Sequence, residues 1–193
     1  KYFKWYEKIG EFGGKINKSR FEKYIEKKDK VLDFGCGGGY LLSELNCKEK
    51  YGVEINPVAI KICRRRKIKI YKNTKKLKKN YFDKIISNNS LQHCEDPFLE
   101  IKNLHQSLKN NGLIIIVTAC ASRNHKYFPK DINYQMYSWS PMNLGNLLEN
   151  SFLGVFIFLI CLGCYYFFVF RNSEGRVKKA YSKLNDVLMK DEA

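Results

Sequence analysis

Short apolar runs alternate with amphipathic stretches through the first two thirds of the chain. The apolar runs are rich in β-branched and aromatic residues and predict strands at 30–34, 50–55, 68–71, 82–87 and 113–119. The amphipathic stretches predict helices at 18–28, 39–46, 56–66 and 96–109. Strands and helices that alternate with short connections are typical of βαβ units. The pattern therefore predicts an α/β fold with a parallel sheet covered by helices on both faces.

Capping residues mark several of these helix ends. Asn56 and Asp96 each precede a proline, which is the expected order of an N-cap and a first helical position. We expect 110–112, "NNG", to end the last of these helices before strand 113–119. Its buried face should hold Phe98, Ile101, Leu104 and Leu108. The first helix should bury Phe21, Tyr24 and Ile25.

Charge and composition only partly restrict the possible binding partners of the chain. The chain has 193 residues, a length that suits one domain, and a net charge of +16 from 35 basic and 19 acidic residues. This charge fits an anionic partner, or else the coding bias of an AT-rich genome, because Lys, Asn, Ile, Phe and Tyr are all abundant. The basic residues are spread, with one dense stretch at 64–79. We favour coding bias, and anion binding stays open.

Cysteine and histidine usage argues against disulfides and metals. The chain has seven cysteines without regular spacing, which favours a reducing, cytoplasmic location over a disulfide framework. Cys161 and Cys164 form a lone CxxC inside an apolar run, where we expect buried small side chains. Only three histidines exist and none has zinc-like spacing with cysteine, so we expect no metal.

The first strand leads directly into the glycine-rich stretch "VLDFGCGGGYL" at 31–41. In parallel sheets, ligands bind at the carboxyl ends of the strands, where this stretch lies. It lacks the Gly-Lys-Ser/Thr of a phosphate loop, and Tyr40 stands where a dinucleotide fingerprint needs its third glycine. The spacing that fits is acid-x-Gly-x-Gly-x-Gly, from Asp33 through Gly35 and Gly37 to Gly39.

A second carboxylate, Glu54, follows the next strand, 21 residues after Asp33. An acid at that place can accept both hydroxyls of a ribose. Together, "VLDFGCGGG", "GVEINP", "FDKIISNNSLQH" and "LKNNGLIIIV" resemble the motifs of class I S-adenosylmethionine-dependent methyltransferases over residues 29–119. The chain is most similar to the small methyltransferase domains of bacterial glycan and small-molecule pathways. The resemblance implies a Rossmann-like, doubly wound, mostly parallel seven-stranded sheet with an antiparallel C-terminal strand.

The resemblance implies S-adenosylmethionine as the cofactor and assigns roles near the first strand. Asp33 would hold the methionine amino group, directly or through water. Gly35, Cys36 and Gly37 would line the methionine and the ribose, with Gly39 completing the loop. Glu54 would bind the ribose hydroxyls.

Further roles fall at the following strand ends. Ile55 would pack on the adenine. Asn73 and Thr74 stand where such enzymes often place an aspartate for the adenine amino group, and Asn73 could accept through its amide oxygen. Asn88 and Asn89 would face the sulfonium end of the cofactor.

Methyl transfer is an in-line displacement that depends mainly on alignment, although an alcohol acceptor can also need a base. His93 lies just past the fourth predicted strand and is our candidate base, with loop packing as its alternative role. We expect His105 to be structural and His125 to lie near the substrate. The stretch "SNNSL" lacks the Asn/Asp-Pro-Pro-aromatic motif of base-amino methylation, and no cysteine follows a proline. Nucleic acid is therefore not the favoured acceptor.

Loops beside the strand ends are candidates for the acceptor pocket. We expect residues 123–139, together with the N-terminal 2–14, to form it, because both stretches mix aromatic and polar side chains. For Trp5 and Trp139, ordinary packing over the end of the sheet is an equal alternative. A helix should then run from Ser140-Pro141 to near Asn150.

Residues 151–170 carry no charge and are long enough to span a membrane. Basic residues follow at once, so the positive-inside rule would place the cofactor domain outside the cell, away from its cofactor. We therefore expect two strands, at 153–161 and 165–170, joined at Leu162-Gly163. Peripheral membrane contact stays open.

These expectations describe one domain with five parts. They are an N-terminal substrate-side segment (1–28), a cofactor-binding core (29–119), a substrate-side loop and helix (120–150), a strand hairpin (151–171) and a terminal helix (175–190). The leading hypothesis is a cytoplasmic methyltransferase acting on a small-molecule or glycan-linked acceptor, with oxygen as the expected acceptor atom. The alternatives are an RNA or protein methyltransferase that uses the basic surface, and a non-catalytic module that binds the cofactor.

Overall fold

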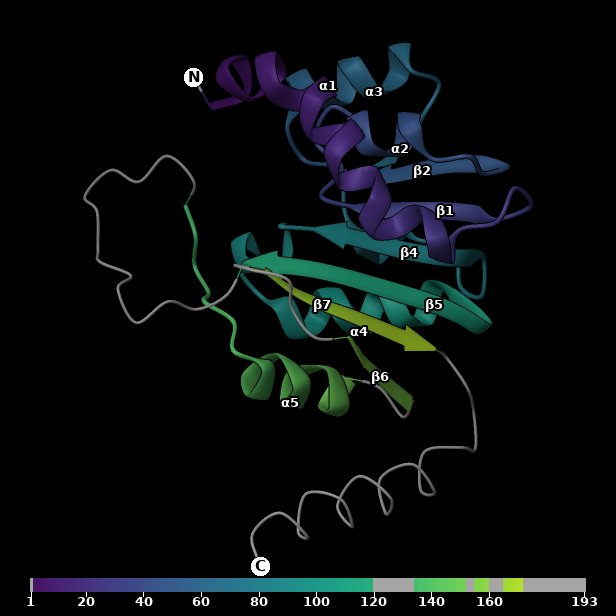
Figure 1. The fold of residues 1–193 in the computed structure, drawn as a ribbon, viewed down its shortest axis with the longest axis vertical. Coiled ribbons are helices and arrows are strands. Elements are labelled where there is room, and N and C mark those ends of the chain that lie inside the picture. Colours follow the sequence, from purple (N-terminus) through teal and green to yellow (C-terminus); the bar gives the residue numbers. More distant parts are fainter. Residues whose placement is uncertain (1, 120–133, 152–154, 160–164, 172–193) are drawn as a thin grey trace, which may run out of the picture.

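A seven-stranded sheet forms the centre of the molecule (Figure 1). The computed structural model describes residues 2–119, 134–151, 155–159 and 165–171. The sheet order is β3-β2-β1-β4-β5-β7-β6, and β7 is antiparallel to both of its neighbours. The strands are β1 (Lys30–Phe34), β2 (Glu49–Val53), β3 (Lys69–Tyr71), β4 (Phe82–Asn88), β5 (Leu108–Ala119), β6 (Val155–Leu159) and β7 (Tyr165–Arg171).

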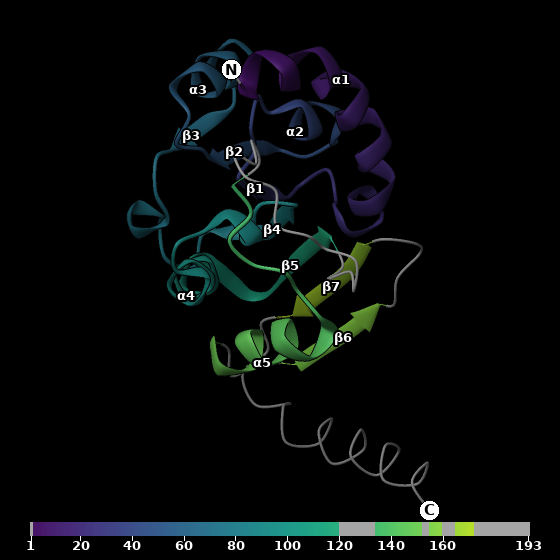
Figure 2. The ribbon, with the colours of Figure 1, turned by 90° about the vertical axis from the view of Figure 1, so that its left-hand side faces the viewer.

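Helices cover the sheet on both sides (Figure 2). They are α1 (Tyr2–Phe21), α2 (Tyr40–Glu44), α3 (Pro57–Arg65), α4 (Pro97–Ser107) and α5 (Pro141–Ser151), with short 3-10 turns η1 (Glu22–Tyr24), η2 (Thr74–Lys76) and η3 (Leu91–His93). The first three helices lie on one side of the sheet and the last two on the other. This is the doubly wound, mostly parallel arrangement that the sequence predicts.

Alternation along the strands builds a separate core on each face. Val31, Ile86 and Ile115 pack with α1, α2 and α3, whereas Leu32 and Ile85 pack with α4 and α5. All five side chains are fully buried. Because both faces of the central strands are covered, these strands read as continuous apolar runs in the sequence.

The strand order reverses beside β1. The chain passes from β1 outward to β2 and β3, and then returns to β4 on the other side of β1. The carboxyl ends of β1 and β4 therefore flank the crevice at which open α/β sheets bind their ligands. The glycine loop at 35–39 and the asparagines at 88–89 lie at this point.

Several predicted boundaries are confirmed. Asn56 caps α3, since its side chain accepts from the amides of Val58 and Ala59 at 2.9 and 3.4 Å. Asp96 caps α4 by accepting from the amide of Leu99 at 2.9 Å. The predicted C-terminal hairpin appears as β6 and β7. Within the described ranges, no helix combines the length and the apolar character needed to cross a bilayer.

Three predictions about elements are wrong. The first helix spans Tyr2–Phe21 rather than 18–28, because its glycines pack closely on α2 instead of breaking the helix. Residues 110–112 do not separate α4 from a strand that starts at 113: β5 already begins at Leu108, and Asn111 adopts a φ of 63° where the pairing with β4 shifts register. Phe98 is 42% exposed, because it lies on the outer side of α4.

Other predictions fall on residues outside the described ranges. These are the joint at Leu162-Gly163, the terminal helix 175–190, the role of His125 and most of the predicted acceptor loop, 123–133.

Candidate functional site

Three glycines shape the loop after β1. Gly35, Gly37 and Gly39 have φ angles of 73°, 54° and 72°, which L-residues with side chains rarely adopt. The amides of Gly35 and Cys36 both donate to the carbonyl of Val53, at 3.0 and 3.2 Å. The loop therefore folds back onto the end of β2, beside Glu54.

The Glu54 carboxylate holds this loop in place. One of its oxygens, Oε2, accepts from the amide of Gly37 at 2.8 Å. The other, Oε1, accepts from the amides of Ile55 and Asn56, both at 2.8 Å. Three charge-assisted bonds fix the side chain where β1 and β2 end. Next to it, Ile55 is 82% exposed, so an apolar side chain lies open at the edge of the loop.

Asp33 lies in a small cavity close to Glu54. The cavity is lined by Gly10, Gly13, Gly14, Asn17, Asp33, Gly35, Cys36, Tyr40, Leu41 and Asn88. Its enclosed space is about 30 Å³, roughly that of one water or one ammonium group. Asp33 is only 3% exposed, and burial, with smaller contributions from Cys63 and Glu54, raises the pKa of its carboxyl well above the usual range. Ionised Asp33 therefore needs a cation.

Two asparagines at the end of β4, Asn88 and Asn89, lie across the crevice from Asp33. In the described part of the chain, the side-chain oxygens of Asn88 and Asn89 are buried without a hydrogen-bond partner. Asn88 lines the cavity with Asp33, whereas Asn89 has a φ of 54° and donates its amide to the carbonyl of Val117 at 2.8 Å. Buried acceptors without partners are costly, so both oxygens are suited to receive a donor from a ligand.

Ser90 is a site residue that the sequence analysis missed. Its hydroxyl lies 3.3 Å from the carbonyl of Gly35 and 3.2 Å from that of Asn88. A side chain at Gly35 would collide with Ser90, so these two residues fit together across the crevice. A serine in a loop carries no distinctive spacing, and only the approach of β1 to β4 reveals this contact.

Gly38 and Gly39 shape the loop by packing. A Cβ at Gly38 would overlap the ring of Tyr40, which explains a glycine that the spacing alone does not. A Cβ at Gly39 would meet Ile68 and, at 3.1 Å, the sulfur of Cys63. The thiol of Cys63 in turn donates to the carbonyl of Gly37 at 3.0 Å. Gly39 thus faces the core between the loop and α3, rather than the cavity.

Asn73 and Thr74 follow β3 with different surroundings. Asn73 is exposed, whereas Thr74 is buried. The Thr74 hydroxyl donates to Glu100 at 2.7 Å and accepts from the side chain of Asn103 at 2.9 Å. Thr74 thus joins η2 to α4 through its side chain. The side-chain amide of Asn73, by contrast, is exposed and open to a ligand.

His93 lies in η3, after β4, and is exposed. Its Nδ1 atom is 3.4 Å from the carbonyl of Tyr134, so the residues before α5 lie over this turn. The neighbouring Cys94 is not a nucleophile, since burial raises the pKa of its thiol to about 12. His105, on α4, is partly buried and lies outside the cavity lining.

The predicted acceptor region is described only in part. Tyr137 stacks on Trp139 with ring centroids 5.4 Å apart. Trp139 is buried in the core beneath α4 and α5, which agrees with packing rather than with an open pocket wall. Tyr134 and Met136, by contrast, are exposed beside His93.

Helix α1 lines the cavity beside Asp33, whereas the sequence analysis assigns its residues 2–14 to the acceptor pocket. Gly10, Gly13, Gly14 and Asn17 line the cavity beside Asp33. The close spacing of glycines in "GEFGG" was the available signal, because glycine allows two backbones to approach closely. No group of three or more His, Cys, Asp or Glu side chains in the described ranges could hold a metal ion.

A doubly wound sheet, a glycine loop at its switch point and a carboxylate at the end of β2 define a class I S-adenosylmethionine-dependent methyltransferase. The chain belongs to the family described as "Methyltransferase domain", whose model matches residues 15–152. S-Adenosylmethionine is the cofactor of this class.

Known structures and sequences agree with this assignment. A methyltransferase structure from Archaeoglobus fulgidus has a TM-score of 0.65 at 18% identity, covering 88% of this chain and 99% of that one. A TehB-like methyltransferase from Corynebacterium glutamicum has a TM-score of 0.66 at 17% identity, covering 89% and 96%. At these identities, the structures show the shared fold.

Curated relatives are also similar in sequence. The ubiquinone biosynthesis O-methyltransferase of Rickettsia typhi is 29% identical over 163 residues, covering 72% of this chain and 65% of that protein. The protein of the same name from Pelagibacter ubique is 36% identical over 103 residues, covering 48% and 42%. The chain thus spans less than two thirds of the length of either relative.

Proposed function

We propose that the chain transfers a methyl group from S-adenosylmethionine to a hydroxyl oxygen of a small molecule. The observation that carries this proposal is the cavity at the switch point. It joins a buried carboxyl, Asp33, to a buried acceptor without a partner, Asn88, beside a loop held by Glu54.

The cavity suits the amino group of the cofactor. An ammonium group is about as large as a water molecule and donates three hydrogen bonds. It would neutralise Asp33 and satisfy the side-chain oxygen of Asn88. The chemistry of these two acceptors therefore supports a cationic end group in the cavity.

The nucleoside end lies along the open side of the loop. After its three amide bonds, the Glu54 carboxylate has one acceptor position left, on Oε2, and this position accepts from a ribose hydroxyl. Ile55 provides an exposed apolar surface for the adenine, and Asn73 an open amide for its edge. Gly35, Cys36 and Gly37 form the wall between the two ends.

The bound cofactor supplies a methyl group that its sulfonium has already activated. Asn89 positions the acceptor beside the end of β4, where its buried oxygen lacks a partner. His93 would take up the proton that the acceptor hydroxyl loses on methylation and pass it to solvent, while the methyl carbon–sulfur bond breaks and the cofactor leaves as a neutral thioether. The Nδ1 atom of the exposed His93 ring is 3.4 Å from the carbonyl of Tyr134, and the exposed Met136 donates its amide to the carbonyl of Gln92, the residue before His93, at 2.9 Å.

The acceptor is best described as a small molecule with a ring hydroxyl. This follows the curated relatives, which are named as O-methyltransferases of ubiquinone biosynthesis. The exposed Tyr134 and Met136 are suitable contacts for such a ring. Neither the comparisons nor the described residues favour a glycan-linked acceptor.

Calorimetric titration with S-adenosylmethionine tests the cofactor site. We expect wild type to bind S-adenosylmethionine. Glu54→Gln should lower the affinity at least about tenfold, because the side-chain NH2 group of glutamine would face a hydrogen-bond donor from which the carboxylate now accepts. Glu95→Gln, at an exposed acid outside the cavity, is the matched control. No binding by wild type would refute the proposal.

Turnover with a panel of phenols, sugars, RNA and peptides tests the acceptor. We expect phenols to be methylated, and His93→Gln to lower kcat by about 10²-fold or more with unchanged cofactor affinity. His105→Gln on α4 should leave both values unchanged. Binding without any turnover would instead indicate a non-catalytic module, and methylation of RNA or peptides alone would move the activity to those acceptors.

A further inference from the structure

The positive charge of the chain is concentrated in one stretch, which we call the basic edge and define as residues 64–79. It contains ten Lys and Arg residues and no acid, and the acid-free region extends from residue 55 to residue 82. The molecule carries 35 basic and 19 acidic residues in all. Coding bias adds lysine throughout a chain, but it does not remove every acid from one region.

The basic edge follows one side of the molecule. It starts at the end of α3, passes along β3, which is the outermost strand, and continues through η2 toward β4. Figure 2 shows this path descending from α3 and β3 to the level of α4 along a single border. Nine of the ten cations are exposed. One of them, Lys69, pairs with Glu49, and the other eight form the row considered below: Arg64, Arg65, Lys67, Lys72, Lys75, Lys76, Lys78 and Lys79.

Few carboxylates neutralise this row. In the described ranges, the ion pairs of the basic edge are Arg66 with Glu11 at 3.2 Å and Lys69 with Glu49 at 2.9 Å. Elsewhere, lysines alternate with acids: Lys84 pairs with Asp29 and Lys109 with Asp83. Like charges held together along an edge repel each other unless a polyanion approaches.

Protection of an edge strand explains only a small part of this pattern. Lysine on an edge strand discourages pairing with another sheet. Strand β3 is short, however, and contains a single lysine, Lys69. The other cations lie on α3, on η2 and in the turns, where there is no sheet edge to protect.

The surroundings of the cations indicate the kind of partner. Surfaces that insert into membranes combine basic residues with exposed apolar anchors. None of the exposed large hydrophobic side chains of the described chain lies within residues 64–79. Single-strand binders present exposed aromatic rings on which bases stack, and the one aromatic ring of the basic edge, Tyr71, is only partly exposed, beside Tyr51.

We infer that the basic edge binds the phosphate backbone of a nucleic-acid duplex, without reading its sequence. A duplex presents phosphates in a regular row and keeps its bases stacked inside, which suits a row of lysines that contains no exposed aromatic ring. None of the ten cations lines the cavity around Asp33, so binding needs neither the cofactor nor the proposed methyl transfer.

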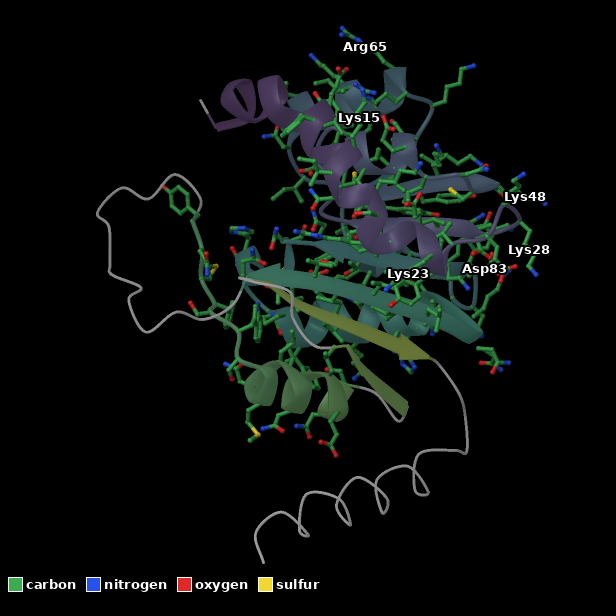
Figure 3. The ribbon with its side chains drawn as sticks, viewed as in Figure 1. Lys15, Lys23, Lys28, Lys48, Arg65 and Asp83 are labelled. Atoms are coloured by element: carbon green, nitrogen blue, oxygen red, sulfur yellow. The ribbon has the colours of Figure 1, made fainter. Side chains whose placement is uncertain are left out.

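The test compares two variants with the same net charge. The edge variant replaces Lys75, Lys76, Lys78 and Lys79 with Gln. The control variant replaces the exposed Lys15, Lys27, Lys48 and Lys102 with Gln, of which Lys15 and Lys48 are labelled on α1 and before β2 in Figure 3. Circular dichroism and S-adenosylmethionine binding check that both variants fold.

Fluorescence anisotropy then measures binding to a labelled duplex of about 20 base pairs, prepared once as RNA and once as DNA, at several salt concentrations. We expect the edge variant to lose about tenfold or more in affinity and the control variant at most about threefold. For DNA, the slope of log affinity against log salt should become shallower by about 3 to 4 in the edge variant, the amount expected for four lost phosphate contacts.

Three results would overturn the inference. Equal losses in both variants would mean that net charge alone attracts the duplex. Binding to vesicles with anionic lipids, but to neither duplex, would assign the basic edge to membranes. If wild type binds neither duplex at low salt, the basic edge has no polyanionic partner. This conclusion would hold whether or not methyl transfer is found.

Discussion

Asp33 and Glu54 show how surroundings give two carboxylates of one site different properties. Glu54 accepts hydrogen bonds from three backbone amides, which fix its orientation. Asp33 is enclosed beside α1, and burial favours its protonated form. The first carboxylate is therefore part of the frame of the site, whereas a cation beside the second would favour its charged form.

This difference predicts that cofactor binding releases a proton. The folded-state pKa of Asp33 lies above its unfolded value, so the free protein holds a proton that the unfolded chain has lost, and its stability falls as the pH rises through this interval. An ammonium beside Asp33 expels the proton. Affinity for S-adenosylmethionine should therefore rise with pH and level off above the folded-state pKa. Calorimetry in buffers with different ionisation heats measures the release.

Asp33→Asn is the variant that isolates this effect. It keeps the size of the side chain but has no proton to release, so its weaker binding should show no buffer dependence. Proton uptake by wild type, or release that persists in Asp33→Asn, would assign the proton to another group.

The sequence predicts which residues meet at this site but not how each is used. Asp33, Gly35, Gly37 and Glu54 follow from spacing, because parallel strands end at the same edge of the sheet. The bond between Thr74 and Glu100 depends on where η2 lies against α4, and no spacing encodes it. The contact of Ser90 with Gly35 likewise arises from neighbouring strands that are far apart in the chain.

At the scale of elements, α1 depends on close packing rather than on helix propensity. It contains three glycines, each of which disfavours a helix. Gly10 and Gly14 face Tyr40, and a side chain at either position would collide with it. The absence of side chains lets α1 approach α2 closely (Figure 1). Gly10, Gly13 and Gly14 of α1 line the cavity beside Asp33.

Neighbouring glycines of α1 should respond in opposite ways to alanine. A Cβ at Gly14 would lie 2.8 Å from the carbonyl carbon of Tyr40 and 2.9 Å from its oxygen, and a backbone cannot rotate away. Gly14→Ala should therefore lower the free energy of unfolding by about 1–3 kcal/mol. A Cβ at Gly13 meets nothing within 4 Å, so Gly13→Ala should raise it by about 0.5–1 kcal/mol. Urea denaturation measures both, and equal stability of the two variants would argue against close packing of α1 on α2.

The element errors have a common physical origin. From local sequence, the glycines of α1 and the "NNG" of 110–112 predict the end of a secondary-structure element. In the structure, tertiary contacts allow the helix and the strand to continue through these residues. Asn111 adopts a positive φ inside β5, where the pairing with β4 shifts register from Phe82–Leu108 to Lys84–Leu113. A bulge of this kind inserts residues without ending the strand. The bounds of the buried strands β1 and β4 are predicted to within one residue, because their continuous apolar runs indicate strands unambiguously.

At the scale of the whole molecule, charge is the property that fold and site leave unexplained. A net charge of +16 works against a compact state, because folding brings like charges together. Local ion pairs compensate at the amino ends of the strands, where Figure 3 labels Lys28 and Asp83. Lys28 pairs with Glu26 at 2.9 Å, and Asp83 pairs with Lys109 at 2.7 Å. Lys84 and Asp29 are paired at 3.7 Å there, with side chains that are mostly buried. In the described part of the chain, the ion pairs of the basic edge are those of Arg66 with Glu11 and Lys69 with Glu49.

Salt should therefore stabilise the fold. Between about 0.01 and 0.5 M potassium chloride the screening length shortens several-fold, so repulsion along the basic edge weakens, while largely buried pairs such as Lys84 with Asp29 are screened less. We expect a gain of roughly 1 kcal/mol, or about 2–4 °C in Tm, by thermal denaturation. The edge variant at Lys75, Lys76, Lys78 and Lys79 should gain less than its charge-matched control, because it has already lost the repulsion. A Tm that falls with salt would mean that ion pairs outweigh this repulsion. Equal gains in the two variants would mean that the repulsion comes from the whole surface and not from the basic edge.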